Sequence, residues 1–318
     1  MNNLNIIFDT NIYRGLTYGL NRIEVIERFE QIKQAETARD LTGVLTAVTA
    51  MELLSHLAND DDPGFEQCKQ AIIGAGIHAT GEYLHFIPHI TLQLQQLVFG
   101  QLNPADVHGN EVIADLVSLI SAGNPEKNIA KYNDQITEIN RLVQLHKSDF
   151  ISTSQSAANL VDPKASNGQI FKNDKDQRQG LLKILKSEQP IMLQARGYFD
   201  KTIKGKFHHF SKKMAEQKIT EIARCYKTAL TLHVKLLERV AISGYDMTNN
   251  KKNRANTIFD IYQLFSVNDE TIQGKESVFV TNEKWLKEVA IESGFSEKVI
   301  DLTTYLKVLE IDTLIGHR

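Results

Sequence analysis

The sequence contains few of the residues that cross-link or interrupt a chain. Among 318 residues there are 2 cysteines, 6 prolines and 1 tryptophan. Cys68 and Cys225 stand far apart, in no CxxC-like or Cys/His spacing, which argues against a disulfide framework and against a zinc site. The scarcity of proline, together with long stretches of helical periodicity, predicts a helix-dominated fold with a few short strands.

Long apolar runs and an excess of one charge are also missing. No stretch approaches the roughly 18 apolar residues that a membrane span needs, and the opening MNNLNIIFDTN carries no basic segment of a secretory signal. We therefore expect a cytoplasmic protein with no membrane partner. The formal net charge is −3, from 36 Lys plus Arg against 39 Asp plus Glu. Bulk charge alone is thus not expected to hold the chain on nucleic acid.

Short apolar strands alternate with helical patterns at both ends of the chain. Residues 4–8 and 43–46 have strand character, and helical patterns follow them at 21–38 and 47–57. The alternation returns late in the sequence, with a helix at 256–265, a strand at 277–280, a helix at 283–293, a strand at 299–301 and a helix from about 303. Repeated strand-then-helix units predict an α/β fold with a parallel sheet flanked by helices.

The middle of the chain has a different character, because strand signals nearly vanish between residues 59 and 245. Three segments there carry apolar residues at helical spacing, namely 111–122, 128–150 and 209–243. Residues 152–176 are rich in Ser, Asn, Lys and Asp and are predicted to form an exposed loop. We therefore predict a discontinuous α/β domain, 1–58 and 246–318, interrupted by a large, mostly α-helical insertion, 59–245.

Four acidic residues are the candidates for chemistry. Asp9 ends the first strand and Glu283 follows the strand 277–280, and ligand sites of parallel sheets form at the carboxyl ends of the strands. Glu52 and Asp260 lie on predicted helices among apolar neighbours. An ionised carboxylate in such surroundings is costly unless it is paired or binds a cation.

Each acid also has a structural interpretation when it is taken alone. Asp9 suits an Asx turn, Glu52 suits a helix surface, and Asp260 is close enough in sequence to pair with Arg254. Four acids in matching contexts and in this order nevertheless favour a metal-dependent, nuclease-like site.

Four segments resemble motifs of the PIN-domain nucleases: IIFDTNIYRG, LTAVTAMELL, NRANTIFDIYQL and VFVTNEKWL. The resemblance covers roughly residues 4–58 and 246–310 and leaves the middle of the chain unmatched. It implies a PIN-like central sheet and an endonuclease that hydrolyses phosphodiester bonds with Mg²⁺ or Mn²⁺. It favours RNA over single-stranded DNA as the substrate.

The resemblance also implies roles for single residues. Asp9, Glu52, Asp260 and Glu283 would bind the metal and carry the catalysis, although position 283 more often holds Asp in the family. Supporting contacts to ligands or substrate would come from Asn11, Asn256 and Thr281. The chemistry agrees, because Mg²⁺ prefers oxygen ligands and two such ions can assist an in-line displacement at phosphorus.

Charge is segregated along the chain. Residues 201–227 contain eight Lys or Arg against two Glu, whereas the first 62 residues contain ten acids against five bases. A solvated helix face is the ordinary interpretation of such a run, but basic helices with interleaved aromatic residues also suit phosphate contact and base stacking. The predicted nucleic-acid contacts are Lys204, Lys206, His208, His209, Lys212 and Lys213.

The sequence therefore predicts an endoribonuclease, and a toxin or phage-defence setting with an inhibitory partner protein enters by analogy only. A homodimer is left open. One alternative is a catalytically inactive PIN-like module that binds RNA or protein. A second is a haloacid-dehalogenase-like phosphatase with Asp9 as nucleophile, which is weaker because such enzymes need a second Asp where Asn11 stands.

Overall fold

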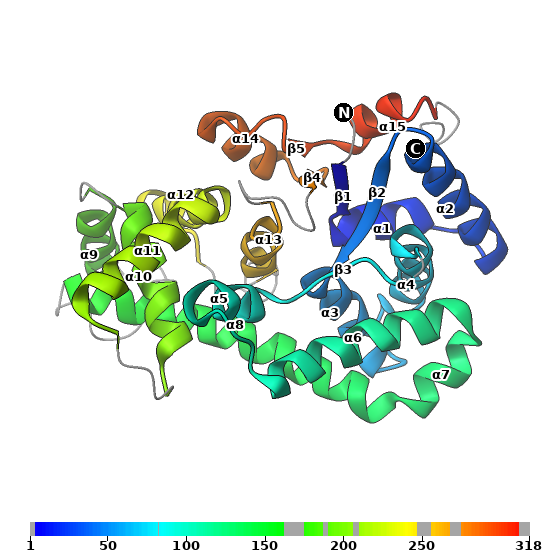
Figure 1. The fold of residues 1–318 in the computed structure, drawn as a ribbon, viewed down its shortest axis with the longest axis horizontal. Coiled ribbons are helices and arrows are strands. Elements are labelled where there is room, and N and C mark those ends of the chain that lie inside the picture. The colour runs from blue at the N-terminus through cyan, green and yellow to red at the C-terminus, as the bar shows by residue number, and fades with distance from the viewer. Residues whose placement is uncertain are drawn as a thin grey trace. The chain divides into compact units, whose positions relative to one another are not determined.

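The computed structural model describes residues 4–81, 83–161, 175–186, 190–205, 210–246, 256–267 and 275–311 (Figure 1). The chain forms two compact units. The first unit comprises residues 1–92, 102–143 and 266–318, and the second comprises 93–101 and 144–265. The boundary between the units falls within two helices, α5 (Ile90–Phe99) and α8 (Asn133–Val161). Each unit is described by itself below.

A five-stranded, fully parallel sheet forms the core of the first unit. Its strands are β1 (Leu4–Phe8), β2 (Leu41–Thr46), β3 (Phe86–Ile87), β4 (Glu276–Val280) and β5 (Val299–Ile300). The predicted α/β class with a parallel sheet is confirmed. The sequence pattern predicted the other four strands but not β3, which is two residues long.

The strand order, β3-β2-β1-β4-β5, places β1 in the centre of the sheet. Leu4 of β1 pairs with Leu41 of β2 on one side and with Glu276 of β4 on the other. The chain builds outward from β1 to β3 and later returns to place β4 on the opposite side of β1. The order of the strands therefore reverses between β1 and β4, the position at which α/β sheets usually bind ligands.

Helices follow each strand of the first unit. They are α1 (Thr10–Thr17), α2 (Arg22–Thr37), α3 (Ala47–Ser55) with a short 3₁₀ turn η1 (His56–Ala58), α4 (Phe65–Ala79), α6 (Pro104–Ala122), α7 (Pro125–Lys131), α14 (Lys284–Ser293) and α15 (Leu302–Val308). Helix α2 begins at a capping box, in which Asn21 and Glu24 satisfy each other's backbone N–H groups. Helix α1 was not predicted, because Asp-Thr-Asn is good turn material, yet here Asp9 serves as its N-cap.

A buried polar cluster joins the layers of the first unit. The ring of His78 on α4 stacks on Phe8 of β1 with a centroid separation of 4.2 Å. His78 also hydrogen-bonds to Tyr13 of α1 at 2.7 Å and to Glu36 of α2 at 3.0 Å. Tyr305 of α15 donates to the same Glu36 oxygen at 2.6 Å. These contacts fix α1, and with it the end of β1, against three other helices.

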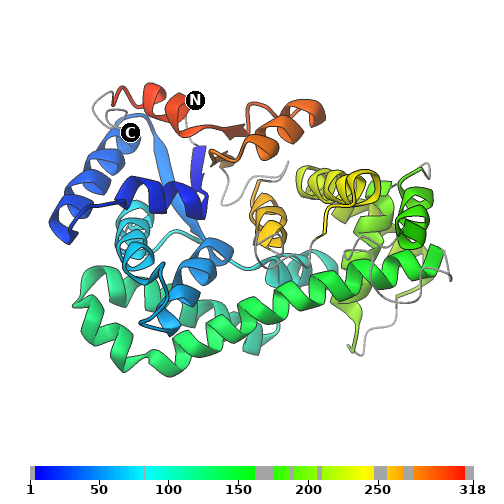
Figure 2. The ribbon, with the colours of Figure 1, turned by 180° about the vertical axis from the view of Figure 1, so that it is seen from behind.

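The second unit is helical throughout the part of it that the structure describes. Apart from its shares of α5 and α8, it contains α9 (Lys175–Leu185), α10 (Pro190–Ile203), α11 (Lys212–Cys225), α12 (Lys227–Ser243) and α13 (Thr257–Leu264) (Figure 2). The single helix predicted for 209–243 is wrong. It is two helices parted at Tyr226, where a φ of −116° and a ψ of 29° lie outside the α region, so one helix ends at this residue and the next begins.

The exposed loop predicted for 152–176 is also wrong over part of its length. Helix α8 continues to Val161 and α9 begins at Lys175, while residues 162–174 lie outside the described residues. Ser and Asn are only weakly unfavourable inside a helix, so a polar composition did not prevent α8 from extending.

The two units divide the chain differently from the predicted domain and insertion. Residues 59–92 and 102–143 belong to the first unit, although they were predicted to lie in the insertion 59–245. The physical reason is α4, which packs against α1, α2, α3, α6 and β2 and so completes the sheet's helical layer. No helix in the described part of the chain is both long and apolar enough to cross a membrane.

The contact between α4 and α2 yields a stability prediction. A Cβ atom at Gly74 would lie 2.7 Å from Cδ2 of the buried Phe29 ring, whereas a Cβ at Gly109 of α6 meets nothing within 4 Å. Gly74→Ala should therefore lower the free energy of unfolding by about 1–3 kcal/mol. Gly109→Ala should leave it unchanged or raise it by up to about 1 kcal/mol, because Ala favours a helix interior. Urea unfolding of both variants measures the difference, and equal effects would contradict the close packing.

Candidate functional site

Asp9 lies at the carboxyl end of the central strand. It follows β1 directly, and its backbone N–H donates to the carbonyl of Val280 at 3.0 Å, which ties it to the end of β4. Its side chain caps α1 and accepts a hydrogen bond from the backbone N–H of Asn11 at 3.3 Å. Only 2% of Asp9 is exposed. The same carboxylate therefore makes the local Asx-type contact and occupies the point where the strand order reverses.

Two residues, Thr281 and Asn11, connect Asp9 with Glu283. The buried hydroxyl of Thr281, just after β4, donates to Oδ2 of Asp9 at 2.8 Å and accepts from the backbone N–H of Glu283 at 3.0 Å. The side-chain amide of Asn11 donates to Oε1 of Glu283 at 3.1 Å. Four of the predicted site residues thus meet within one hydrogen-bonded network.

Glu52 reaches the same edge from α3. Its Oε2 accepts a hydrogen bond from the hydroxyl of Thr10 at 2.7 Å, and Thr10 is the residue that follows Asp9. Glu52 is half-buried. Thr10 was not among the predicted site residues. The only feature of the sequence that could have indicated Thr10 was its neighbour Asp9, because the bond from Thr10 to Glu52 joins residues 42 positions apart.

The surroundings of Asp9 disfavour its negative charge. Burial raises the pKa of Asp9 from 3.8 to about 6, and the charge of Glu283 acts in the same direction. The hydrogen bonds from Thr281 and from the backbone of Asn11 act in the opposite direction and do not compensate fully. A carboxylate in this position gains from a nearby cation.

Asp260 and Asn256 belong to the second unit. Asp260 is half-buried in the first turn of α13, and Asn256 is exposed at the start of that helix. The hydrogen bonds that join Asp9, Asn11, Thr281 and Glu283 lie within the first unit. The convergence of Asp260 with Asp9, Glu52 and Glu283 stays a prediction.

The predicted basic contacts lie in the second unit as well. Lys204 follows α10, and Lys212 and Lys213 open α11; all three are exposed. Lys206, His208 and His209 lie outside the described residues. Another cation of the same run, Lys218, is occupied, because its Nζ donates to the carbonyl of Leu97 and to Glu221.

The donor atoms at the carboxyl edge suit a hard divalent ion. Asp9, Glu283 and Glu52 offer carboxylate oxygens, the ligands that Mg²⁺ and Mn²⁺ prefer, and the raised pKa of Asp9 marks a site that a cation would stabilise. Among the described residues, no three or more His, Cys, Asp or Glu side chains are grouped so that they hold a metal ion. The carboxylates thus have the chemistry that such an ion prefers, although the described residues do not form a group of three ligands.

Comparisons with protein-family models, with curated proteins and with solved structures gave no significant match to this chain. The assignment of the site therefore depends on its own geometry and on the motif resemblance.

The raised pKa of Asp9 predicts how stability depends on pH. Below pH 3.8 the Asp9 carboxyl is protonated in both the folded and the unfolded state and does not lower the free energy of unfolding. Between pH 3.8 and about 6 its ionisation lowers this free energy increasingly, and above pH 6 the loss is complete. Asp9→Asn removes the charge, so it should raise the free energy of unfolding at pH 7.5 by about 1–3 kcal/mol. At pH 3.5 it should have little effect. Urea unfolding at the two pH values, without divalent ions, measures this.

Asp301→Asn is the control of opposite sign. The backbone N–H of Thr304 and the side chain of Lys287 lower the pKa of Asp301, so its ionised form is favoured in the folded state. This substitution should cost more stability at pH 7.5 than at pH 3.5. An Asp9→Asn effect that is the same at both pH values would contradict the buried, charged carboxylate.

Proposed function

We propose that the protein is a PIN-like, metal-dependent endonuclease that hydrolyses phosphodiester bonds, with RNA preferred over single-stranded DNA. The observation that carries the proposal is the buried carboxylate of Asp9 at the strand-order reversal, joined by Thr281 and Asn11 to Glu283. A structural Asp rarely keeps a second carboxylate beside it, because like charges disfavour each other. Acids arranged in this way are typical of sites that bind cations.

Asp9 and Glu283 would hold a Mg²⁺ or Mn²⁺ ion, with Glu52 beside them. Such an ion, when bound, supplies Lewis-acid polarisation of a phosphoryl oxygen and lowers the pKa of a coordinated water. The chain's own residues orient the ligands: Thr281 fixes the Asp9 carboxylate, Asn11 fixes Glu283, and Thr10 fixes Glu52. The roles of Asp260 and Asn256 rest on the motif resemblance alone.

Exposed cations on the second unit support a nucleic-acid substrate. Lys212 and Lys213 stand in the first turn of α11, where the helix N-terminus already favours anions. Two cations at this end gain nothing from the helix dipole, so their placement favours contact with a polyanion over a role in helix stability.

The binding-module alternative is favoured by one observation, the lack of a closed three-ligand group among the described residues. Calorimetry with Mn²⁺ separates the two functions. Binding of Mn²⁺ in the millimolar range or tighter, lost in Asp9→Asn, supports the nuclease. Retained RNA binding without any Mn²⁺ affinity supports the module.

The cleavage experiment uses labelled single-stranded RNA and DNA of one sequence with MnCl₂. Wild type should cleave the RNA, and Asp9→Asn and Asp260→Asn should each reduce the rate by about 100-fold or more, because each removes a proposed ligand charge. The exposed Asp115 of α6 provides the control Asp115→Asn, which should cleave like wild type. Absence of cleavage by wild type, or cleavage by the Asp9 and Asp260 variants at the wild-type rate, would refute the proposal.

Thr281 allows a finer test of the site. Thr281→Val removes the donor to Asp9 and the acceptor for the backbone of Glu283, so cleavage should fall by about 10- to 100-fold. Thr281→Ser keeps the hydroxyl and should restore most of the rate. If Val and Ser variants of equal thermal stability cleave alike, the hydroxyl has no role in positioning the carboxylates.

A further inference from the structure

A second set of polar side chains lies one helical turn beyond the contact between Thr10 and Glu52. Arg14 follows Thr10 by four residues on α1, and His56 follows Glu52 by four residues where α3 passes into η1. Residues four apart share a helix face, about 6 Å apart along the axis. The bond from Thr10 to Glu52 joins the two faces, so Arg14 and His56 extend the edge that carries the carboxylates.

Arg14 is held in place by α4. Its Nε and Nη2 donate to Oε1 of Gln67 at 3.2 and 2.8 Å, and Nε2 of Gln67 donates back to the carbonyl of Arg14 at 3.2 Å. A guanidinium has five N–H groups, so Gln67 fixes its orientation and leaves donors for a ligand. No carboxylate takes part in these bonds, which leaves the charge of Arg14 available to an anion.

His56 is held by the acidic loop that precedes α4. Its Nδ1 lies 2.9 Å from Oδ2 of Asp62, and Oδ1 of Asp62 accepts from the backbone N–H of Gly64 at 2.7 Å. An ionised carboxylate only accepts hydrogen bonds, so Nδ1 carries the proton. In the neutral form of this tautomer Nε2 is an acceptor, and 37% of the His56 side chain is exposed.

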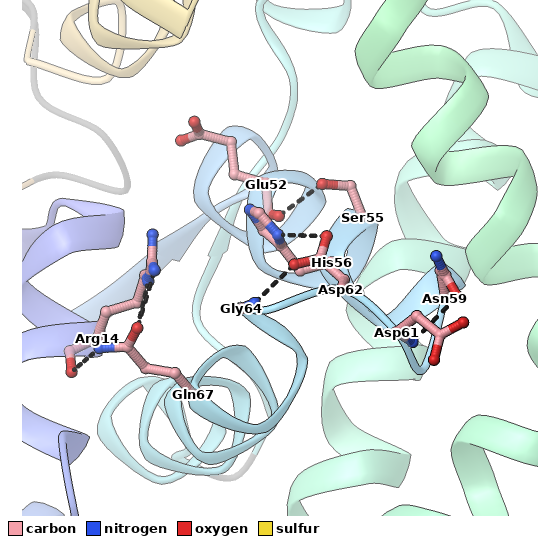
Figure 3. A network of polar contacts seen from close by, with 9 residues as sticks. All are labelled: Arg14, Glu52, Ser55, His56, Asn59, Asp61, Asp62, Gly64 and Gln67. Carbon is pink, nitrogen blue, oxygen red and sulfur yellow. Dashed lines mark hydrogen bonds and ion pairs between the residues drawn. The ribbon is translucent and has the colours of Figure 1, made fainter. Parts of the chain in front are cut away.

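The charges of Arg14, Asp62 and Glu52 all act on the same buried residue of α4. Burial raises the pKa of the Cys68 thiol to about 12, and the charges of these three residues act on it as well. Figure 3 shows Arg14 and Glu52 extending toward the same side of α4, with His56 beside Glu52. The guanidinium of Arg14, the acceptor Nε2 of His56 and the carboxylate of Glu52 therefore belong to one surface of the first unit.

We propose that Arg14 and His56 form a ribonucleotide subsite, in which Arg14 binds a backbone phosphate and Nε2 of His56 accepts a hydrogen bond from the ribose 2′-hydroxyl. The subsite rests on the proposed function, since it receives the nucleotide next to the bond that is cleaved. A phosphodiester has no hydrogen to donate, whereas the 2′-hydroxyl does, and this group is what distinguishes RNA from DNA. His56 is thus the residue that sets the preference for RNA.

The test measures binding of the full chain to a fluorescent 12-nucleotide RNA and to DNA of the same sequence, by anisotropy in CaCl₂. His56→Asn keeps a donor for Asp62 at the position of Nδ1 and removes Nε2. It should weaken RNA binding by about 3- to 10-fold, the size of one hydrogen bond, and leave DNA binding unchanged. Arg14→Gln should weaken RNA and DNA alike and reduce the slope of log K against log salt by about 0.7.

The control for His56 is His108→Asn on α6, because His108 is exposed and stands 3.8 Å from Glu111. It should bind RNA and DNA like wild type. Thermal unfolding checks that His56→Asn is folded, and a long-range ¹H–¹⁵N spectrum of the histidine rings should show the His56 proton on Nδ1. A proton on Nε2 overturns the assignment of the acceptor.

Each outcome decides between the two proposals. Equal loss of RNA and DNA binding in His56→Asn, or no loss, overturns the subsite, and wild-type cleavage then leaves the nuclease standing. A preference for RNA that depends on His56, in a chain that cleaves nothing, refutes the nuclease and supports the subsite. If wild type binds neither the RNA nor the DNA, the subsite is overturned, and the nuclease proposal is then tested by the cleavage assay alone.

Discussion

The first unit is organised around a carboxylate buried at the end of its central strand. Asp9 is nearly inaccessible, and its pKa is raised because burial and the charge of Glu283 outweigh the hydrogen bonds that it accepts. The backbone N–H of Asn11 at the N-terminus of α1 and the hydroxyl of Thr281 both donate to this one group. A chain selected only for stability would place Asn or Ser there, since either caps a helix without the cost of charge.

Glu36 shows how the same unit treats a buried carboxylate in its core. One of its oxygens contacts the ring of His78 and the hydroxyl of Tyr305, and these partners come from α4 and α15. Asp9 has an acid for a neighbour where Glu36 has an imidazole. The Glu36 cluster therefore binds helices together, whereas the Asp9 network stores an unfavourable charge at a ligand-binding position of the fold.

The sequence predicted the acids of the carboxyl edge better than it predicted the helices around them. Asp9 and Glu283 stand next to strand signals, so the rule that parallel strands end at one edge brings them together. Glu52 lies on the helix after the second strand and was added by the motif resemblance. Thr10, Arg14 and His56 had no such signal. Helix α1 was read as a turn, and the partners of Thr10 and Arg14 come from α3 and α4, which are distant in sequence.

The sequence by itself determined the α/β class, the four main strands and the residues that end them, because apolar runs and their breakers are local properties. Only the tertiary structure decided which residues share an edge, that α4 completes the first unit, and that Asp9 is buried beside Glu283. Burial and pairing depend on contacts between distant segments. A carboxylate's pKa, and with it the chemistry it supports, is set by those contacts and not by its neighbours in the chain.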